Sequence, residues 1–282
     1  MAEAKVNIYQ MSKAPAFLKA FRARPGHKIV SLDFCSIEDV VLTERTMDPN
    51  LVRLYGPGQP PNCGYLFLAS QLPFVRDEVL KWYDPDATTR TEEELAVAKK
   101  MLKPIRSMTK PAKLAMNYGA YPKRVQAQCT AWGHPISFEQ AQAIFDTYHG
   151  MFPGIREASE RLQAEVRNNG GYFLNGRGRP MAVAPNKMRD VVNTYCQSTA
   201  GDLLLTYTRI LVRLKLEYKL DWHPWLINFY DECDIECPDE KAEEIRLMMN
   251  HCLHLLNEEI QPNIPIKGEA VICDTMADWK CD

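Results

Sequence analysis

Runs of apolar residues at three distant places in the chain predict β-strands. The segment Lys28–Asp33 follows the turn-forming Pro25-Gly26, is mostly apolar and ends on a carboxylate, as a buried strand would. Residues 225–238 alternate apolar and polar side chains on both sides of the acidic Asp231-Glu232, which predicts a tight hairpin. A third β-like stretch lies at residues 264–272. The pattern therefore places carboxylates at the ends of predicted strands.

Between these strands, apolar positions repeat mostly at helical spacing. Thr91 with Glu94, and Ser137 with Gln140, have the spacing of capping boxes that begin two helices, the first of which ends before Pro104. Residues 54–85 are rich in Pro and Gly and are expected to be irregular apart from a short helix at 66–71. Further helices are expected at residues 105–119, 153–170, 189–218 and 239–255, with a hairpin at residues 172–184 around Asn175-Gly176.

Composition indicates an ordinary globular protein. A chain of 282 residues with 46% apolar residues can bury a large core in one big or two modest domains. The nine cysteines are odd in number and contain no C-x-x-C pair, so neither a disulfide framework nor a zinc ribbon is indicated. No segment has the apolar length of a signal peptide or a membrane helix. We therefore expect a soluble protein of the cytoplasm with no membrane partner.

The charges are unevenly distributed. A net charge of −2 argues against proteins that coat nucleic acid through bulk basicity. The segment Lys99–Lys113, however, contains six cations and no acid. Such a run is as often a solvated helix face as a binding site, so its surroundings must decide between the two.

The two acidic strand ends, Asp33 and Asp231-Glu232, have the chemistry that phosphoryl transfer requires. Two Mg²⁺ ions about 3.5–4 Å apart clamp the attacking and leaving oxygens, and hard oxygen ligands hold them. Taken alone, an aspartate at a strand end is more often a turn former, and an acidic hairpin tip is more often solvated surface. The neighbouring motifs are therefore needed to choose between these interpretations.

Four motifs surround these carboxylates. Residues 32–39, Leu-Asp-Phe-Cys-Ser-Ile-Glu-Asp, have an aspartate followed by an aromatic residue and, five positions on, a glutamate. Residues 106–119 contain Arg-x3-Lys-x7-Tyr-Gly, and residues 189–202 contain Arg-x3-Asn-x3-Gln-Ser-Thr-Ala-Gly-Asp. Residues 228–232 are Asn-Phe-Tyr-Asp-Glu. In this order they resemble motif A, motif B, the minor-groove helix and motif C of family A DNA polymerases, with Tyr230 where the family usually has histidine.

Shorter similarities follow the family's order at Asn7-Ile8, Phe138–Pro153, Gly176–Arg179 and Asp278–Lys280, so the resemblance covers nearly the whole chain. It implies an α+β fold: a polymerase palm with an antiparallel sheet at residues 1–60 and 170–282, and a helical fingers insertion at residues 61–169. It also implies template-directed transfer of a nucleotide from a dNTP to a primer 3′-hydroxyl.

The resemblance assigns catalytic roles to three carboxylates. Asp33 and Asp231 would bridge two Mg²⁺ ions, with Mn²⁺ as a possible substitute. The backbone carbonyl of Phe34 would be a further metal ligand, and Glu232 a weaker one.

It also implies a nucleotide site. Arg106 and Lys110 would neutralise the triphosphate, and Glu38 would be the steric gate that excludes a ribose 2′-hydroxyl. Leu114 stands near the sugar where the family commonly has Phe or Tyr, which leaves sugar discrimination open at that position. Tyr118 would stack near the templating base pair. The residues expected to bind template and primer are Gly119, Arg189, Asn193, Gln197, Arg177 and Arg179.

Pro111 directly follows the proposed phosphate ligand, and a proline is tolerated in a helix only in its first turn. Either the fingers helix begins at Pro111 and Lys110 contacts the triphosphate, or the register of the motif differs and Lys113 contacts it. We prefer Lys110.

Two other groups of residues could be interpreted as a metal site or a nuclease site, but these interpretations are weaker. His251-Cys252-x-His254 lies on an apolar helix face and is expected to be packed or solvated. Asp234 and Glu236 alternate on a strand and are expected to face solvent. A non-catalytic module that binds DNA or a replication protein is the main alternative function, and Glu38 argues against a second alternative, a single-subunit RNA polymerase.

The family's thumb and 3′-5′ exonuclease precede motif A and have no counterpart in the leading residues. We therefore expect a second polypeptide to supply them, unless the 282 residues are a fragment of a longer chain. A shortened polymerase of this kind suggests a phage. The expected partners are primer-template DNA, a dNTP and that second polypeptide.

Overall fold

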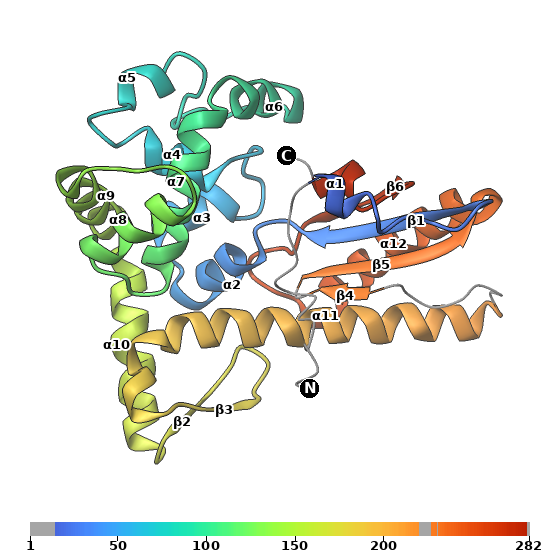
Figure 1. Cartoon of the computed structure of the whole chain (residues 1–282). Helices are drawn as coiled ribbons and strands as arrows, with labels where there is room; N and C mark the ends of the chain where they lie inside the picture. The colour runs from blue at the N-terminus through green and yellow to red at the C-terminus, as the bar shows by residue number, and fades with distance from the viewer. Residues whose placement is uncertain (1–14, 220–226, 230, 281–282) are drawn as a thin grey trace, which may run out of the picture. The chain divides into compact units, whose positions relative to one another are not determined.

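The computed structural model describes residues 15–219, 227–229 and 231–280 (Figure 1). They form two compact units. Unit 1 contains the described residues up to Ile37, residues 200–262 and those from Ile266 onwards, and unit 2 contains residues 38–199 and 263–265. The expected palm and fingers boundaries remain a prediction, because these units are defined by compactness alone.

Unit 1 is built around a four-stranded antiparallel sheet in the order β4-β5-β1-β6. Figure 1 shows β1 in blue beside β5 in orange, so segments from opposite ends of the chain pair directly. The strands are β1 His27–Phe34, β4 Ile227–Phe229, β5 Glu232–Pro238 and β6 Gly268–Cys273. The predicted hairpin and the expected antiparallel sheet are confirmed.

The centre of β1 is buried on both faces. Ile29, Val30, Ser31 and Leu32 are each at most 1% exposed, which explains why this strand is a continuous apolar run rather than an alternating one. Helix α12 (Ala242–Ile260) packs against β1 and β6. The remaining elements of unit 1 are α1 Pro15–Leu18, η3 Asp239–Lys241, α13 Ala277–Lys280 and the part of α11 (Val191–Glu217) from Ala200 on.

Unit 2 is helical apart from one small hairpin. Both predicted capping boxes are formed: the Thr91 and Ser137 side chains accept from the third helical N–H, and Glu94 and Gln140 bond back to the cap. Its elements are α2 Ile37–Thr46, α3 Pro49–Tyr55, α4 Gly64–Ala69, α5 Arg76–Val79, α6 Glu92–Met101, α7 Lys103–Asn117, α8 Pro122–Ala131, α9 Phe138–Met151, α10 Pro153–Asn168, β2 Tyr172–Leu174, β3 Pro180–Ala182, η2 Pro185–Asp190 and the first turns of α11.

The structure corrects several sequence expectations. Helix α8 was not expected, although Pro122 at its first position is a helix-start signal. Asp239 does not cap α12: it lies in the short 3₁₀ helix η3, and Lys241 is the N-cap residue with no side-chain hydrogen bond. Asn7-Ile8, Trp225 and Tyr230 lie outside the described residues. Among the helices that the structure describes, none is both long and apolar enough to cross a membrane.

Candidate functional site

Three acidic residues lie at one end of the β1–β5 pair in unit 1. The antiparallel register places Asp33, near the end of β1, opposite Glu232, the first residue of β5. The backbone N–H of Phe34 donates to the carbonyl of Asp231 at 3.0 Å, which fixes the hairpin tip against the end of β1. Residues distant in sequence are thus held together by backbone pairing.

The side chains of Asp33 and Glu232 share one face of the sheet. Ser31 Oγ donates to Glu232 Oε1 at 3.2 Å, and Asp33 follows Ser31 by two residues on the same strand, so it projects to the same side. Glu232 is buried, whereas Asp33 is exposed and Asp231 is half-buried. The exposed and half-buried carboxylates are the ones that a ligand in solvent can reach.

These oxygens suit a hard divalent cation that keeps part of its shell for water and substrate. Mg²⁺ is usually held by one or two carboxylates with several waters and substrate phosphates, not by a closed protein cage. Among the residues that the structure describes, no group of three or more His, Cys, Asp or Glu side chains is placed to hold a metal ion by itself. The carboxylates of Asp33 and Asp231 have the chemistry that Mg²⁺ or Mn²⁺ requires, and water and substrate would have to complete the coordination shell.

Gly268 is a site residue that sequence reasoning missed. It pairs with Phe34 across β1 and β6, and a Cβ atom at this position would lie only 2.7 Å from the backbone oxygen of Asp33. The glycine thus allows β6 to approach the residue that carries the exposed carboxylate. An isolated glycine inside the expected β-like stretch at residues 264–272 was the available signal.

The predicted nucleotide residues lie along α7 in unit 2. Arg106, Lys110 and Leu114 are spaced by four residues, so they follow one face of the helix, and all are half-buried. The expectation that this helix could begin at Pro111 is wrong, because Pro111 lies buried within α7. The helix continues past it with one backbone N–H fewer.

Lys113, seven residues after Arg106, is buried more deeply than these half-buried residues and is only 1% exposed. Its ammonium group forms an ion pair with Asp39 on α2. The charge of Lys113 is thereby neutralised inside unit 2, which argues against Lys113 as the ligand of a triphosphate.

Tyr65 on α4, a second residue that sequence reasoning missed, carries three cations against its ring. Arg106 Cζ, Lys110 Nζ and Lys113 Nζ lie 5.6, 5.9 and 5.8 Å from the ring centroid. Burial raises the pKa of the Tyr65 hydroxyl well above its usual value, so the ring stays neutral. Arg106 Nε is buried and has no hydrogen-bond partner among the described residues.

The predicted gate residue Glu38 is engaged by α7. The Tyr118 hydroxyl donates to Glu38 Oε2 at 2.6 Å, which joins the first turn of α2 to the C-cap of α7. Burial, and then the negative charge of Glu38, raise the pKa of Tyr118 far above its usual range. Tyr118 is therefore a neutral donor at all working pH values.

Of the residues expected to contact template and primer, Arg189, Asn193 and Gln197 occupy η2 and the start of α11, and Gly119 follows the end of α7. Gly119 has φ +70°, and a Cβ atom there would lie 3.3 Å from the Arg189 carbonyl oxygen. The Arg189 guanidinium lies 5.4 Å from the centroid of the Tyr121 ring. Asn193 and Gln197 follow on one face of α11; Gln197 is exposed, and Asn193 Oδ1 is buried without a hydrogen-bond partner in the described part of the chain.

Arg177 and Arg179 lie in the loop of the β2–β3 hairpin, and both side chains are exposed. The turn is wider than the expected Asn175-Gly176 pair: it runs from residue 175 to 179, and the N–H groups of both arginines donate to Asn175 Oδ1 at 3.0 and 2.9 Å. Gly176 donates to Thr199 Oγ1 at 2.9 Å, which ties the loop to α11. The two cations are thus presented on a fixed loop.

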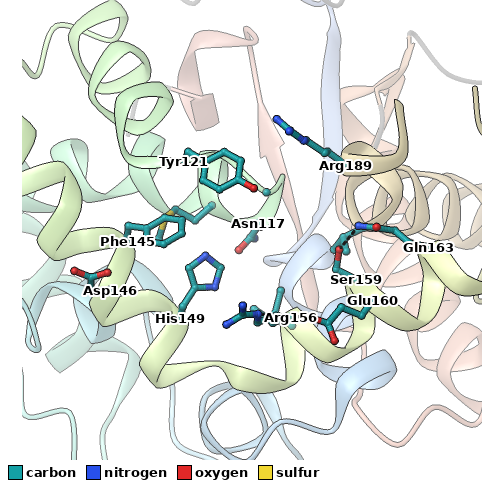
Figure 2. Close-up of a pocket in the computed structure, with 14 residues that line it drawn as sticks. Asn117, Tyr121, Phe145, Asp146, His149, Arg156, Ser159, Glu160, Gln163 and Arg189 are labelled. Atoms are coloured by element: carbon teal, nitrogen blue, oxygen red, sulfur yellow. Dashed lines mark hydrogen bonds and ion pairs between the residues drawn. The ribbon is translucent and has the colours of Figure 1, made fainter. Parts of the chain in front are cut away.

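A pocket of about 570 Å³ lies in unit 2 beside Gly119 and Arg189 (Figure 2). Figure 2 shows the rings of Tyr121, Phe145 and His149 on one side of it. Tyr121 and Phe145 stack with centroids 6.2 Å apart, and Phe145 meets His149 edge-on at 4.4 Å. The opposite side is polar and is lined by α10 residues Arg156, Ser159, Glu160 and Gln163.

The expectation that Asp234 and Glu236 face solvent is wrong. Asp234 was expected to face solvent but is 1% exposed, because both faces of the sheet centre are covered. Glu236 is not solvated either: it accepts from Arg24 Nε at 2.7 Å and its side chain is 18% exposed. In the His251-Cys252-x-His254 segment of α12, Cys252 is buried, whereas both histidines are exposed.

The chain is similar to DNA polymerases over most of its length. A model of DNA polymerase family A matches residues 6–278. The chain is 25% identical to DNA polymerase I of Aquifex aeolicus over 261 residues, 89% of this chain and 40% of that protein. It is also 25% identical to the DNA polymerase of Mycobacterium phage D29 over 225 residues, 79% of this chain and 31% of the phage protein.

The fold is that of a solved polymerase domain. The POL domain of Pol1 from M. smegmatis, in complex with DNA primer-template and dNTP, matches with a TM-score of 0.73 at 17% identity, over 96% of this chain and 44% of that one. The chain thus spans less than half the length of each of these relatives. Because the family match extends over nearly all of the 282 residues, the chain belongs to DNA polymerase family A.

Proposed function

We propose that this chain catalyses template-directed DNA synthesis, adding a nucleotide from a dNTP to a primer 3′-hydroxyl. The observation that carries the proposal is the pairing of β1 with β5, which puts Asp33 opposite Glu232 with Asp231 beside them. A family A chain that retains these carboxylates on a fixed backbone frame has the groups that nucleotidyl transfer needs.

Asp33 and Asp231 would hold the divalent cations, with the Phe34 carbonyl as a further oxygen ligand. When bound, two such ions supply charge stabilisation to the attacking and leaving oxygens of an in-line displacement. Glu232 is buried and accepts from Ser31, so its role is to add negative charge beside the site and to fix the start of β5. Asp33, which is exposed, is the carboxylate most accessible to substrate.

Arg106 and Lys110 would bind the triphosphate. The guanidinium can form a fork onto two phosphate oxygens, and the ammonium acts as a point charge. Tyr65 lies against both cations and would hold them in place before the nucleotide arrives. The basic run of the sequence thus has a use besides solvation.

Glu38 would act as the steric gate. Its carboxylate accepts a hydrogen bond from Tyr118, which opposes a rotation that would make room for a ribose 2′-hydroxyl. Leu114, one turn before Tyr118 on α7, would contact the sugar through an aliphatic side chain rather than an aromatic one.

The pocket beside Gly119 and Arg189 would receive the unpaired template strand. Aromatic rings such as Tyr121 and Phe145 offer stacking surfaces to any base, at about 1–3 kcal/mol per base, and Arg189 adds a cation for the backbone. Asn193 and Gln197 would read the minor-groove acceptors that all correct base pairs share. Arg177 and Arg179 would contact phosphates.

Tight binding of a duplex requires more protein surface than these residues provide. Polymerases hold DNA through many phosphate contacts, and a net charge of −2 with one basic cluster supports few of them. We propose that a thumb, and a 3′-5′ exonuclease, act with this chain, whether as a second polypeptide or as more of the same one.

Primer extension on a defined template tests the proposed function. With Mg²⁺ and separate dNTP and NTP pools, the chain should extend the primer with dNTPs and in the order that the template dictates. Binding of primer-template without any extension, under salt low enough to keep the complex formed, would favour a non-catalytic DNA-binding module.

A further inference from the structure

A buried ion pair joins α2 to α7 in unit 2. Lys113 Nζ and Asp39 Oδ1 are in contact, and the side chains are 1% and 9% exposed. A lysine is almost never fully buried unless it is paired, and nothing in the proposed reaction uses this one. The pair therefore needs a role of its own.

The carboxylate of Asp39 is satisfied on both oxygens. Oδ1 also accepts from Asn117 Nδ2 at 3.1 Å, and Oδ2 accepts from the Tyr55 hydroxyl at 2.6 Å. Tyr148, on α9, donates in turn to Asn117 Oδ1. Burial alone would raise the pKa of Asp39, but Lys113 and these donors outweigh it and hold that pKa below its usual value. Asp39 is thus a charged acceptor held directly by donors on two helices, α3 and α7.

The surrounding backbone leaves room for this network. Gly64 begins α4, and a Cβ atom there would lie 2.3 Å from the Tyr55 hydroxyl oxygen and 3.3 Å from Lys113 Cε. The φ of Gly64 is not positive, so the glycine is needed for the space it leaves and not for its backbone conformation. The network and the helix that covers it fit only with a glycine at this place.

Three members of the network are adjacent in sequence to residues of the predicted nucleotide site. Asp39 directly follows the gate residue Glu38, and Asn117 directly precedes Tyr118. Lys113 lies between Lys110 and Leu114, one helical turn from the first. The contacts of Asp39 with Lys113 and Asn117 therefore fix α7 against α2 at two successive turns of α7, at positions next in sequence to Leu114 and Tyr118.

We propose that Asp39 and Lys113 are positioning residues that set the alignment of α7 on α2 and thereby the selectivity of the gate for deoxyribonucleotides. The inference rests on the proposed function. A charged pair with fixed donors and acceptors can specify one register between two helices, as buried polar residues do in some coiled coils. The selectivity of the gate depends on the placement of Glu38 and Leu114. Loss of the register between α2 and α7 should therefore lower the selectivity while synthesis still continues.

The experiment separates alignment from stability by removing the charges singly and together. Lys113→Met leaves a buried, unpaired carboxylate and should lower Tm strongly, while Asp39→Asn combined with Lys113→Met removes both charges and should recover most of that loss. We expect the double variant nevertheless to discriminate deoxy- from ribonucleotides, by the ratio of kcat/KM, at least about tenfold less well than the wild type. We also expect faster hydrogen exchange in the peptide that covers α7.

Two controls accompany the double variant. Val125→Ala, in the buried face of α8, lowers stability without touching the network and should leave the selectivity ratio unchanged. Tyr55→Phe removes only the hydroxyl that donates to Asp39; it should fold, and should shift selectivity in the same direction by a smaller factor.

The outcomes distinguish this inference from the proposed function. If the wild-type chain extends no primer, the proposed function is refuted. In that case hydrogen exchange of α7 in the double variant still decides whether the pair sets the alignment of α7 on α2. If the double variant recovers Tm, selectivity and α7 protection together, the pair is merely structural and the inference is wrong. If the double variant does not fold, unchanged selectivity and α7 exchange in Tyr55→Phe overturn it.

Discussion

The hydroxyl of Tyr118 donates a 2.6 Å hydrogen bond to Oε2 of Glu38, so the C-cap of α7 is joined to the first turn of α2. The donor is a neutral phenol, since burial and Glu38 raise its pKa, and the acceptor is the predicted steric gate. Any change in the position of α7 is therefore transmitted to the gate. The first predictions follow from this link.

Glu38→Ala should admit ribonucleotides. Removing the carboxylate opens the space that a 2′-hydroxyl needs, and we expect the ratio of ribo- to deoxynucleotide kcat/KM to rise at least about tenfold, equivalent to about 1.4 kcal/mol. Tyr118→Phe keeps the ring and removes only the hydrogen bond, so its effect should have the same sign and be smaller. Steady-state kinetics with matched dNTP and NTP pools measures both; an unchanged ratio in Glu38→Ala would place the gate elsewhere.

Gly64→Ala should destabilise unit 2. The added methyl group would press on the Tyr55 hydroxyl and on Lys113, and overpacking of this kind costs about 1–3 kcal/mol. Gly150→Ala is the matched control: nothing lies within 4 Å of a Cβ there, so within a helix the change should be neutral or stabilising by up to about 1 kcal/mol. Urea unfolding of both variants gives the comparison, and equal stability would show that the space at Gly64 is not needed.

Gly268→Ala should impair catalysis more than folding. Its Cβ would lie 2.7 Å from the Asp33 backbone oxygen, so β1 must shift at the residue that carries the exposed carboxylate. A displacement of about 1 Å at a reacting group can cost about 10²-fold in rate, whereas overpacking costs about 1–3 kcal/mol of stability. Extension rate and Tm should be measured on the same sample. A fall in Tm with full activity would contradict the assigned role.

The stability of unit 2 should depend on pH through His149. Burial, and then the charge of Arg156, lower the pKa of this imidazole, while Asp146 opposes them. Below about pH 6.5 the unfolded chain binds a proton at this residue that the native state does not, so the free energy of unfolding should fall as pH drops through that value. His149→Phe, which keeps an aromatic ring beside Phe145, should remove this part of the slope. Denaturant unfolding at pH values from about 5 to 8 tests it.

Local patterns predicted the elements well where the determinants were local. Thr91 with Glu94 identified the start of α6 from four adjacent residues, and the alternation around Asp231 identified the β4–β5 hairpin. The resemblance to family A, carried by fixed spacings such as Arg106 to Lys110, supplied the fold, which pairing within the sheet confirmed.

The unpredicted features depend on contacts between distant residues. Burial of Lys113 requires Asp39, 74 residues away, and within the sequence that lysine is one of six cations in a run. The helix passes through Pro111 because packing outweighs the loss of one backbone hydrogen bond. Likewise, the close approach of Gly268 to Asp33 exists only once β6 has paired with β1.

Extension of a primer by the wild-type chain and by Asp231→Asn, in Mg²⁺ and at about 50 mM salt, tests the central claim most directly. The asparagine keeps the size of the side chain at the hairpin tip and removes the charge that would hold metal. We predict template-ordered dNTP incorporation by the wild type, at least about 10²-fold slower in the variant, with unchanged Tm. Equal rates for the two proteins would contradict the assignment of Asp231 as a metal ligand, and the absence of incorporation by the wild type would contradict the proposed synthesis itself.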